Sequence, residues 1–540
     1  MKFTVLKQVR TYAAAAALTG LVFGHTAIVA AGTEPVPLTS AEINSLVTTV
    51  MEKYNVPGMA VGVVKDGTIV HLEAYGVRRA GEAGTVDTNT LFGIASNSKA
   101  FTTSAIALLV ADGKLRWDDK VIDHIPNFRL HDAWVTREFT VKDLVVHNSG
   151  LGLGAGDLMV WPTSDRSRSE IIQNLRYLKP ESSFRSEYAY DNLLYIVAGE
   201  VIAAASGMSF GEFVNKRLMK PLGMARCAAD RRGLKGEENY AKPHVKVDGK
   251  LLNVEPSEVI DRNPVWSAAG GVQCSIEDMM KWVAMHLRGG KLPDGSRLIS
   301  KRQHKELWTP QTILSVGSVD RKWNNTHYRS YGLGFNLQDS NGHRIISHGG
   351  TLLGMISHTR MVPELGLGVV VLTNQQAYPG RDAIVYSIIK SYITSERVNW
   401  LDRFDTRAAK AKAYTEKRTK KAMSIGQESK IKSLAVTHYQ GRYRDLWFGD
   451  VVIKNQQDTL YFTADKAKRL KGKLEHFNGN VFIVRWDDRS LEADAYVSFN
   501  TSITGTVKGM RMKAVSPATD FSFDFHDLDF TKVKEAKTKH

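Results

Sequence analysis

Cysteine is scarce in this chain, because only Cys227 and Cys274 occur among its 540 residues. Two isolated cysteines exclude a small fold held together by a disulfide framework. They could pair in an oxidising compartment, but buried free thiols are the state we expect. Zinc-ligand spacings are missing as well, so the sequence predicts neither a metal site nor any other cofactor.

Long apolar runs are also scarce, and the only candidate lies at the N-terminus. Three basic residues stand among the first ten, an apolar stretch covers residues 13–23, and small residues follow at 29–31. This order is typical of a secretory signal peptide, which we place at residues 1–31. An uncleaved anchor is the alternative, but the run is short for a bilayer span and His25 interrupts it. We therefore expect a periplasmic or secreted protein with no membrane span once the signal is cleaved.

Acidic residues are outnumbered, since 56 aspartates and glutamates face 72 lysines and arginines, for a formal net charge of +16. A chain with this excess is attracted to anionic cell-wall polymers or lipid surfaces. Nucleic acid is not expected as a partner, because no RNA-binding motif is present and export would separate the two. Much of the excess lies between residues 403 and 432, where we predict a solvated helical linker.

The order of predicted elements favours an α+β fold for residues 33–396. Strands stand at both ends of this stretch, and a mostly helical region at 96–290 separates them. The first strands form a hairpin around Asp66-Gly67, and we expect them to join the later strands in one antiparallel sheet flanked by helices, with a helical subdomain. The later strands are predicted at 331–337, 344–348, 355–361 and 367–372, and helices at 41–54 and 381–393.

After the basic linker, which we place at residues 397–433, short alternating segments continue to the end of the chain. Regularly spaced strands with turn signals predict a small β-barrel-like domain or a sandwich over residues 434–540. The stretch 520–525 alternates with period two and is one of these predicted strands. The sequence leaves the role of this tail open, because it could cap a cleft, bind polymer or mediate oligomerisation.

A candidate catalytic site is indicated by the tetrad Ser96-Asn97-Ser98-Lys99, which precedes an apolar run at 100–110. This order places a hydroxyl at the start of a helix and an amine one turn further along the same face. Serine alone is a poor nucleophile, and a nearby amine that has lost its proton can accept the proton of the hydroxyl. A lone Ser-x-x-Lys match is a weak signal, since an N-cap serine beside a solvated lysine has the same pattern.

Four further stretches follow the tetrad in order and support it. They are His147-Asn148-Ser149-Gly150, Tyr188-Ala189-Tyr190-Asp191-Asn192, Ala268-Ala269-Gly270-Gly271 and His348-Gly349-Gly350-Thr351. Together with the tetrad they resemble the serine β-lactamase-like family, which comprises class C β-lactamases, D-peptidases and related esterases. The resemblance covers residues 38–395 and implies the β-lactamase/transpeptidase-like fold. The tail is similar to a small β-rich domain of unknown function that is often appended to these hydrolases.

The resemblance implies roles for individual residues. Ser96 would be the acylated nucleophile, and Lys99 and Tyr190 would act in acid/base roles. Lysine and tyrosine both titrate at about 10 in water, so which of the two is the base stays open. Asn192 would contact both the lysine and the substrate amide. The other substrate-binding residues would be those of the last motif, His348, Gly349, Gly350 and Thr351.

These residues predict an exported serine hydrolase that cleaves an ester or amide (peptide) bond through a Ser96 acyl-enzyme. β-Lactamases and carboxypeptidases commonly have a cationic lysine where this chain has His348, and a neutral histidine holds a substrate carboxylate less firmly. Esterase or D-amino-acid peptidase activity is therefore favoured over strong β-lactamase activity. The alternatives are a weak β-lactamase or D-peptidase, an acyltransferase with the same motifs, and a non-catalytic cell-wall binding protein. The expected partner is a small ester, amide or peptide, or cell-wall material.

Overall fold

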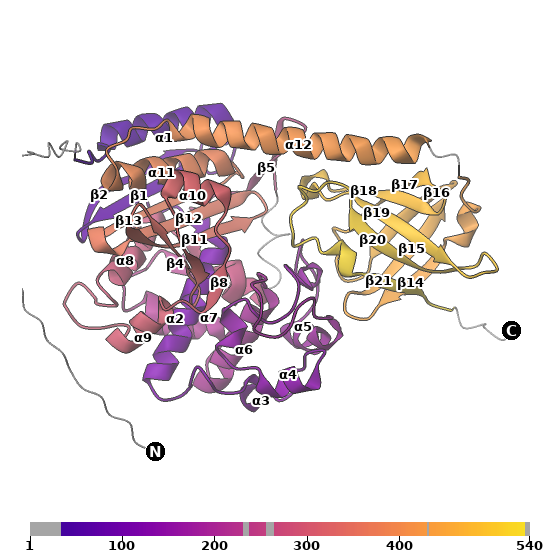
Figure 1. The fold of residues 1–540 in the computed structure, drawn as a ribbon, viewed down its shortest axis with the longest axis horizontal. Helices are drawn as coiled ribbons and strands as arrows, with labels where there is room; N and C mark the ends of the chain where they lie inside the picture. The colour runs from indigo at the N-terminus through magenta and orange to yellow at the C-terminus, as the bar shows by residue number, and fades with distance from the viewer. Residues whose placement is uncertain (1–33, 230–236, 255–263, 429–430, 535–540) are drawn as a thin grey trace, which may run out of the picture. The chain divides into compact units, whose positions relative to one another are not determined.

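The computed structural model describes residues 34–229, 237–254, 264–428 and 431–534 (Figure 1), so the predicted signal peptide lies outside these ranges. The elements up to α11, here called the N-terminal domain, are built on an eight-stranded antiparallel sheet in the order β2-β1-β13-β12-β11-β10-β9-β8. The strands are β1 (Gly58–Lys65), β2 (Thr68–Gly76), β8 (Thr312–Leu314), β9 (Arg329–Tyr331), β10 (Asn336–Ser340), β11 (His343–Leu352), β12 (Met355–Val362) and β13 (Leu367–Thr373).

Both faces of this sheet are covered at its centre, which explains why β1 and β13 are apolar at almost every position. On one face, Met59, Val61 and Val63 of β1 pack with α1 (Ser40–Tyr54) and α11 (Tyr378–Ile393). The opposite face packs on α8 (Ile276–Leu287), and Figure 1 shows α8 on the side away from α1. The predicted α+β fold, an antiparallel sheet flanked by helices, is confirmed.

The region between β2 and β8 is mostly helical, as predicted, and it also contains short elements that periodicity did not reveal. Three two-residue strands form a small sheet, β3 (Phe92–Gly93), β7 (Gln273–Cys274) and β4 (Cys227–Ala228), and β5 (His244–Val247) pairs with β6 (Lys250–Asn253). Besides α8, the helices of this region are α2 (Ser98–Ala111), α3 (Val121–His124), α4 (Ala133–Glu138), α5 (Arg168–Asn174), α6 (Leu193–Ser206), α7 (Phe210–Val214) and α9 (Lys301–Leu307), with π-helical turns η5 (Asn215–Met219) and η9 (Ser267–Gly271). A further helix, α10 (Ser318–Asn324), lies between β8 and β9.

Within the described part of the chain, no single helix has both the length and the apolar character needed to span a membrane. The helix pair that meets this test jointly, α6 with Phe210–Met219, is bent by 73°.

The basic run forms α12 (Trp400–Glu428), a helix of 29 residues. At its beginning Trp400, Leu401 and Phe404 join the core of α1 and α11, and near its end Met423 Sδ accepts from the Tyr496 hydroxyl of the barrel at 3.8 Å. Most of its lysines and arginines are exposed, as expected of a solvated helix.

The tail forms a closed barrel of eight antiparallel strands, so a barrel is confirmed and a sandwich is excluded. Alternate residues fill its interior, for example Leu460 and Phe462. The strands are β14 (Gly441–Asp445), β15 (Gly449–Gln456), β16 (Thr459–Ala464), β17 (Lys471–Asn478), β18 (Val481–Trp486), β19 (Ala495–Thr501), β20 (Val507–Ala514) and β21 (Asp529–Lys532).

The predicted strand at 520–525 is wrong. These residues lie in the connection between β20 and β21, which has no strand and ends in the short helix η13 (Phe525–Asp527). Ser522, Phe523, Asp524 and Phe525 are all buried, although polar and apolar residues alternate. The period of two therefore reflects burial against two different partners and not a sheet with one solvated face.

The barrel and the N-terminal domain are joined by contacts outside this connection. The Asp165 amide donates to the carbonyl of Lys466 (2.9 Å), and Asn174 Nδ2 donates to the carbonyl of Trp447 (3.0 Å). The Arg166 guanidinium donates to the carbonyl of Phe448. Residues 35–540 accordingly form one compact unit.

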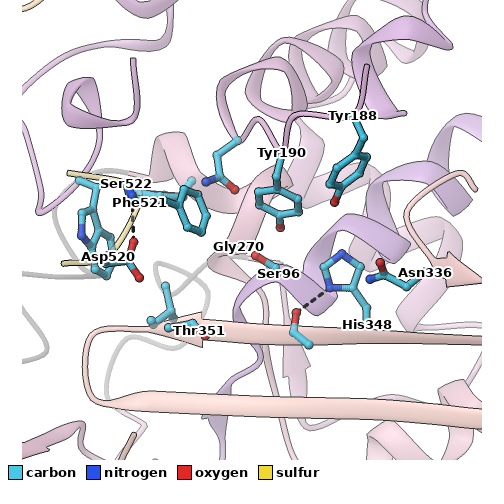
Figure 2. Close-up of a pocket in the computed structure, with 15 residues that line it drawn as sticks. Ser96, Tyr188, Tyr190, Gly270, Asn336, His348, Thr351, Asp520, Phe521 and Ser522 are labelled. Carbon is cyan, nitrogen blue, oxygen red and sulfur yellow. Dashed lines mark hydrogen bonds between the residues drawn. The ribbon is translucent and has the colours of Figure 1, made fainter. Parts of the chain in front are cut away.

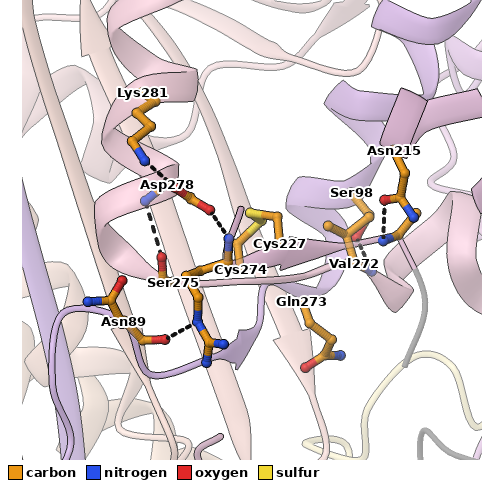
Figure 3. Close-up of a disulfide and its surroundings, with 12 residues drawn as sticks. Asn89, Ser98, Asn215, Cys227, Val272, Gln273, Cys274, Ser275, Asp278 and Lys281 are labelled. Carbon is orange, nitrogen blue, oxygen red and sulfur yellow. Dashed lines mark hydrogen bonds and ion pairs between the residues drawn. A yellow bond between two sulfur atoms is a disulfide. The ribbon is translucent and has the colours of Figure 1, made fainter. Parts of the chain in front are cut away.

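The expectation of free thiols is also wrong, because Cys227 and Cys274 form a disulfide (Figure 3). The two cysteines stand directly opposite each other in the β4–β7 pair, with their Cα atoms 4.2 Å apart. Two strands of two residues each leave no trace of their register in the sequence, so this pairing could not be foreseen. The bond lies close to the tetrad, since the Val272 amide donates to Ser98 Oγ at 3.1 Å.

Replacing both cysteines with alanine is expected to lower the free energy of unfolding by about 4 kcal/mol, because the bond closes a loop of 47 residues. Urea unfolding of the oxidised protein and of the double variant measures this difference. Wild-type protein kept under a strong thiol reductant should unfold like the variant. Equal stability of the oxidised protein and the variant would contradict the prediction.

Candidate active site

Ser96 lies in the turn η1 (Ala95–Asn97), which connects strand β3 of the small sheet to α2. Ala95 has a φ of 51°, in the left-handed region, and the turn is held by side-chain hydrogen bonds. Asn97 Nδ2 donates to Ser357 Oγ (2.8 Å), which donates to the carbonyl of Ile94 (2.7 Å). Most of α2 is buried, whereas Ser96 keeps part of its surface exposed. The turn therefore presents one hydroxyl at the surface of a rigid core.

Lys99 is fully buried, one helical turn after Ser96. Its amine donates to Ser96 Oγ (3.3 Å), Asn192 Oδ1 (2.7 Å) and the carbonyl of Ala269 (2.8 Å). None of these partners is anionic. Burial lowers the pKa of Lys99 to about 7, and the nearby carboxyl groups of Asp157 and Asp191 oppose this shift. An amine with this pKa is half deprotonated at neutral pH and can accept a proton from the hydroxyl beside it.

Tyr190 completes the group that the sequence predicted. The Lys99 amine lies 4.7 Å from the centroid of the tyrosine ring, and Tyr190 and Ser96 line the same pocket. Burial raises the pKa of Tyr190 well above its usual range, and the nearby Ser96 hydroxyl opposes this shift only in part. The structure thus brings the three side chains together around one hydroxyl, with a tyrosine that keeps its proton at neutral pH.

Asn192 links the lysine to a buried carboxyl group that sequence reasoning missed. Its Nδ2 donates to Asp157 Oδ2 at 2.8 Å, while its Oδ1 accepts from Lys99. Burial raises the pKa of Asp157 to about 8 and that of Asp191 to about 7. Asp191 stands inside a motif and was available as a candidate. Asp157 belongs to no motif, so only its position in the fold reveals it.

His348 lies on β11, where its ring is held from both sides. Its Nδ1 donates to the carbonyl of Gly349 (2.6 Å), so its Nε2 accepts from the Tyr331 hydroxyl (3.1 Å). Burial, and then the charge of Lys99, lowers the pKa of His348 to about 3. The imidazole is therefore neutral at working pH, as the sequence analysis assumed. Tyr331 has no sequence signal and was missed.

The glycines of the last motif have different surroundings. Gly349 lines the pocket and has open space where a Cβ would stand. A Cβ on Gly350 would lie 2.4 Å from the carbonyl oxygen of Ile94, so this glycine lets β11 approach the turn of Ser96. Gly350 does not line the pocket, whereas Thr351 does. Gly349 and Thr351 thus lie where a bound substrate could contact them. Gly350 instead allows close packing of β11 against the turn of Ser96.

These side chains open into a pocket of about 300 Å³. Figure 2 shows Ser96 between Tyr190 and His348, with a second wall formed by the connection of the barrel domain. Among the described residues that line the pocket, Asp520 is the only aspartate, glutamate, lysine or arginine. The lining residues that sequence reasoning missed are Trp161, Tyr188, Trp266, Gly270, Asn336, Leu352, Asp520, Phe521 and Ser522.

Comparison with known proteins agrees with the observed fold. The chain matches the beta-lactamase family over residues 43–391 and a domain of unknown function, DUF3471, over residues 427–532. The octameric penicillin-binding protein homologue from Pyrococcus abyssi shares the fold, with a TM-score of 0.57 and 19% identity over 92% of this chain and 100% of that one.

Two curated relatives are more similar in sequence. An unguisins hydrolase of Aspergillus campestris is 28% identical over 375 residues, 65% of either chain. Penicillin-binding protein 4 of Amycolatopsis lactamdurans is 29% identical over 325 residues, which cover 60% of this chain and 82% of that protein. This chain spans about two thirds of the length of the unguisins hydrolases that it matches, 65% of one and 67% of the other.

Proposed function

Because this chain belongs to the beta-lactamase family and is a serine hydrolase of that type, we propose that it cleaves an ester or amide bond through an acyl-enzyme on Ser96. The observation that carries the proposal is the buried amine of Lys99, which lies 3.3 Å from Ser96 Oγ and has a pKa lowered to about 7. A non-catalytic binding protein has no need of such an amine.

In the acylation step, Ser96 Oγ attacks the carbonyl carbon of the substrate and its proton passes to Lys99 Nζ. The negative charge on the carbonyl oxygen would be stabilised by the backbone N–H groups of Ser96 and Thr351. Collapse of the tetrahedral adduct breaks the ester or amide bond. The leaving alkoxide or amine takes a proton from the Tyr190 hydroxyl, which regains one from Lys99. Water then attacks the acyl-enzyme by the same proton route and releases the acid and Ser96.

The lining of the pocket supports an ester or peptide substrate over a β-lactam. Recognition of the β-lactam carboxylate calls for a cation, and the pocket offers the neutral His348 and the acidic Asp520 instead. A charge-assisted hydrogen bond contributes roughly 1.5–3 kcal/mol, which corresponds to a preference of about 10- to 100-fold. None of the described residues that line the pocket is a lysine or arginine that could supply this preference.

We therefore expect benzylpenicillin and its methyl ester to acylate the enzyme with second-order rate constants that differ by less than about threefold, because no lysine or arginine among the described lining residues would stabilise the free carboxylate. Both rate constants are measured by stopped-flow competition with a p-nitrophenyl ester, which should be the better substrate. A preference for the free acid of tenfold or more would contradict this account of His348 and favour the weak β-lactamase or D-peptidase alternative.

We also propose that the enzyme acts outside the cytoplasm, in the periplasm or after secretion. The signal-peptide pattern of residues 1–31 supports this, and so does the disulfide between Cys227 and Cys274, because such bonds persist in oxidising compartments. N-terminal sequencing of the protein from fractionated cells tests the proposal. Recovery of the full-length chain from the cytoplasm with both thiols reduced would contradict it.

A further inference from the structure

The connection between β20 and β21 of the barrel passes along the active-site pocket. Asp520, Phe521 and Ser522 line the pocket, and the ring of Phe521 meets that of Tyr190 edge to face at 5.9 Å. Figure 2 shows these three residues on the side of the pocket opposite Tyr188. The second domain thus supplies one wall of the site.

Ser522 also contacts a buried residue of the N-terminal domain behind the pocket wall. Its hydroxyl donates to Asp157 Oδ2 at 2.8 Å, the same oxygen that accepts from Asn192 Nδ2. Asn192 Oδ1 in turn accepts from Lys99 Nζ at 2.7 Å. A continuous chain of three hydrogen bonds therefore runs from a barrel serine to the amine beside Ser96. All four side chains in it are at most 6% exposed, so water does not compete for these bonds.

Asp524 holds the turn that carries Asp157. Its two carboxyl oxygens accept from the amides of Gly156 (2.6 Å) and Leu158 (3.1 Å), the residues on either side of Asp157. Asp524 itself is fully buried. Two residues of the connection thus determine the position of the Asp157 carboxyl group. Ser522 bonds to its side chain, and Asp524 bonds to the amides that flank it.

We propose that Ser522 and Asp524 are positioning residues for Lys99, so that the C-terminal barrel completes the catalytic machinery of the N-terminal domain within one chain. The proposal rests on the role of Lys99 as the base in the proposed function. Without the Ser522 hydroxyl, Asp157 Oδ2 keeps a single partner, and both Asn192 and the amine that it holds lose part of their restraint.

The same chain of contacts sets a direction for the pH dependence. The hydrogen bond from Ser522 favours the charged form of Asp157, and the negative charge of Asp157 raises the pKa of Lys99. Removing the hydroxyl therefore lets the pKa of Lys99 fall further. The other titratable groups that face Lys99 remain in place in this variant, and they are Asp191, Tyr190, Tyr195, His147 and His348.

The test is the rate of Ser96 labelling by a fluorophosphonate, followed by mass spectrometry between pH 5 and 9, in the full chain. Ser522→Ala should label roughly 3- to 10-fold more slowly on the alkaline plateau, the loss expected of one hydrogen bond. Its ascending limb should lie at lower pH than that of the wild type. Asp524→Asn, which keeps one acceptor for the two amides, should also be slower. Ser516→Ala should match the wild type, because Ser516 lies in the same connection but its hydroxyl accepts from the Ala518 amide and from no other described group.

A melting temperature for each variant separates positioning from folding, since a merely structural loss lowers stability without moving the pH limb. Equal rates and equal pH profiles for Ser522→Ala and the wild type would overturn the proposal while leaving the acyl-enzyme intact. Failure of the wild type to label at all would instead overturn the proposed function on which it rests.

Discussion

Replacing Ser96 with alanine should abolish turnover of p-nitrophenyl acetate, with a loss of about 10⁴-fold or more, because the acyl-enzyme then has no oxygen on which to form. Covalent labelling by a fluorophosphonate should disappear at the same time. Peptide mass mapping of the labelled wild type should place the adduct on Ser96. Since this side chain is small and partly exposed, the substitution should leave the melting temperature almost unchanged.

Ser104→Ala is the matched control for this experiment. Ser104 lies on α2, the helix that follows Ser96, is fully buried, and its hydroxyl has no hydrogen-bond partner among the described residues. Loss of that hydroxyl should leave both turnover and labelling at the wild-type level. An adduct on any residue other than Ser96, or activity that survives in Ser96→Ala, would show that the nucleophile has been assigned incorrectly.

The second large effect is expected for Lys99→Met, which keeps the shape of the side chain and removes the amine. Acylation should slow by about 10³-fold, within the range that general-base catalysis contributes. In the wild type, the rate should rise with pH through about 7, because only the deprotonated amine accepts the serine proton and its pKa is lowered to about 7. This ascending limb should be absent from the residual activity of Lys99→Met.

Tyr190→Phe decides between the two candidate bases that the sequence left open. Burial raises the pKa of Tyr190 well above its usual range, so its phenol does not start the reaction as an anion at neutral pH. In the variant, departure of the leaving group from the tetrahedral adduct should be slower, but the pH profile should keep its ascending limb near pH 7. A limb that vanishes in Tyr190→Phe and persists in Lys99→Met would reverse the two roles.

The central features of the fold were predictable because they depend on local pattern. The strands β1 and β13 are apolar runs of the right length, and the spacing of Ser96 and Lys99 places both on one face of a helix wherever that helix is packed. The ordered motifs extended this to Tyr190 and His348. Their convergence required the whole sheet and the helical subdomain to form, which the order of elements made a reasonable expectation.

Three features of the site could not be predicted, each for the same physical reason. The Cys227–Cys274 bond depends on the register of two strands of two residues each. Asp157 belongs to the site because it accepts a hydrogen bond from Asn192, which lies 35 positions later in the sequence. Ser522 and Asp524 alternate with phenylalanines as in a strand, yet Phe525 stacks on Trp486 of the barrel while Asp524 caps amides of the other domain. Contacts between distant segments leave no periodic signal in the chain.

The sequence by itself determined the chemical groups of this protein and their local geometry: a serine and a lysine one helical turn apart, a tyrosine and an asparagine at a helix start, and a β-rich tail. Tertiary structure alone decided how those groups behave. The pKa of Lys99 falls to about 7 because packing removes the amine from water without giving it a direct anionic partner, and desolvation of this kind is a property of the assembled core. The tail becomes part of the site because folding brings Ser522 within 2.8 Å of Asp157 across 365 positions of sequence.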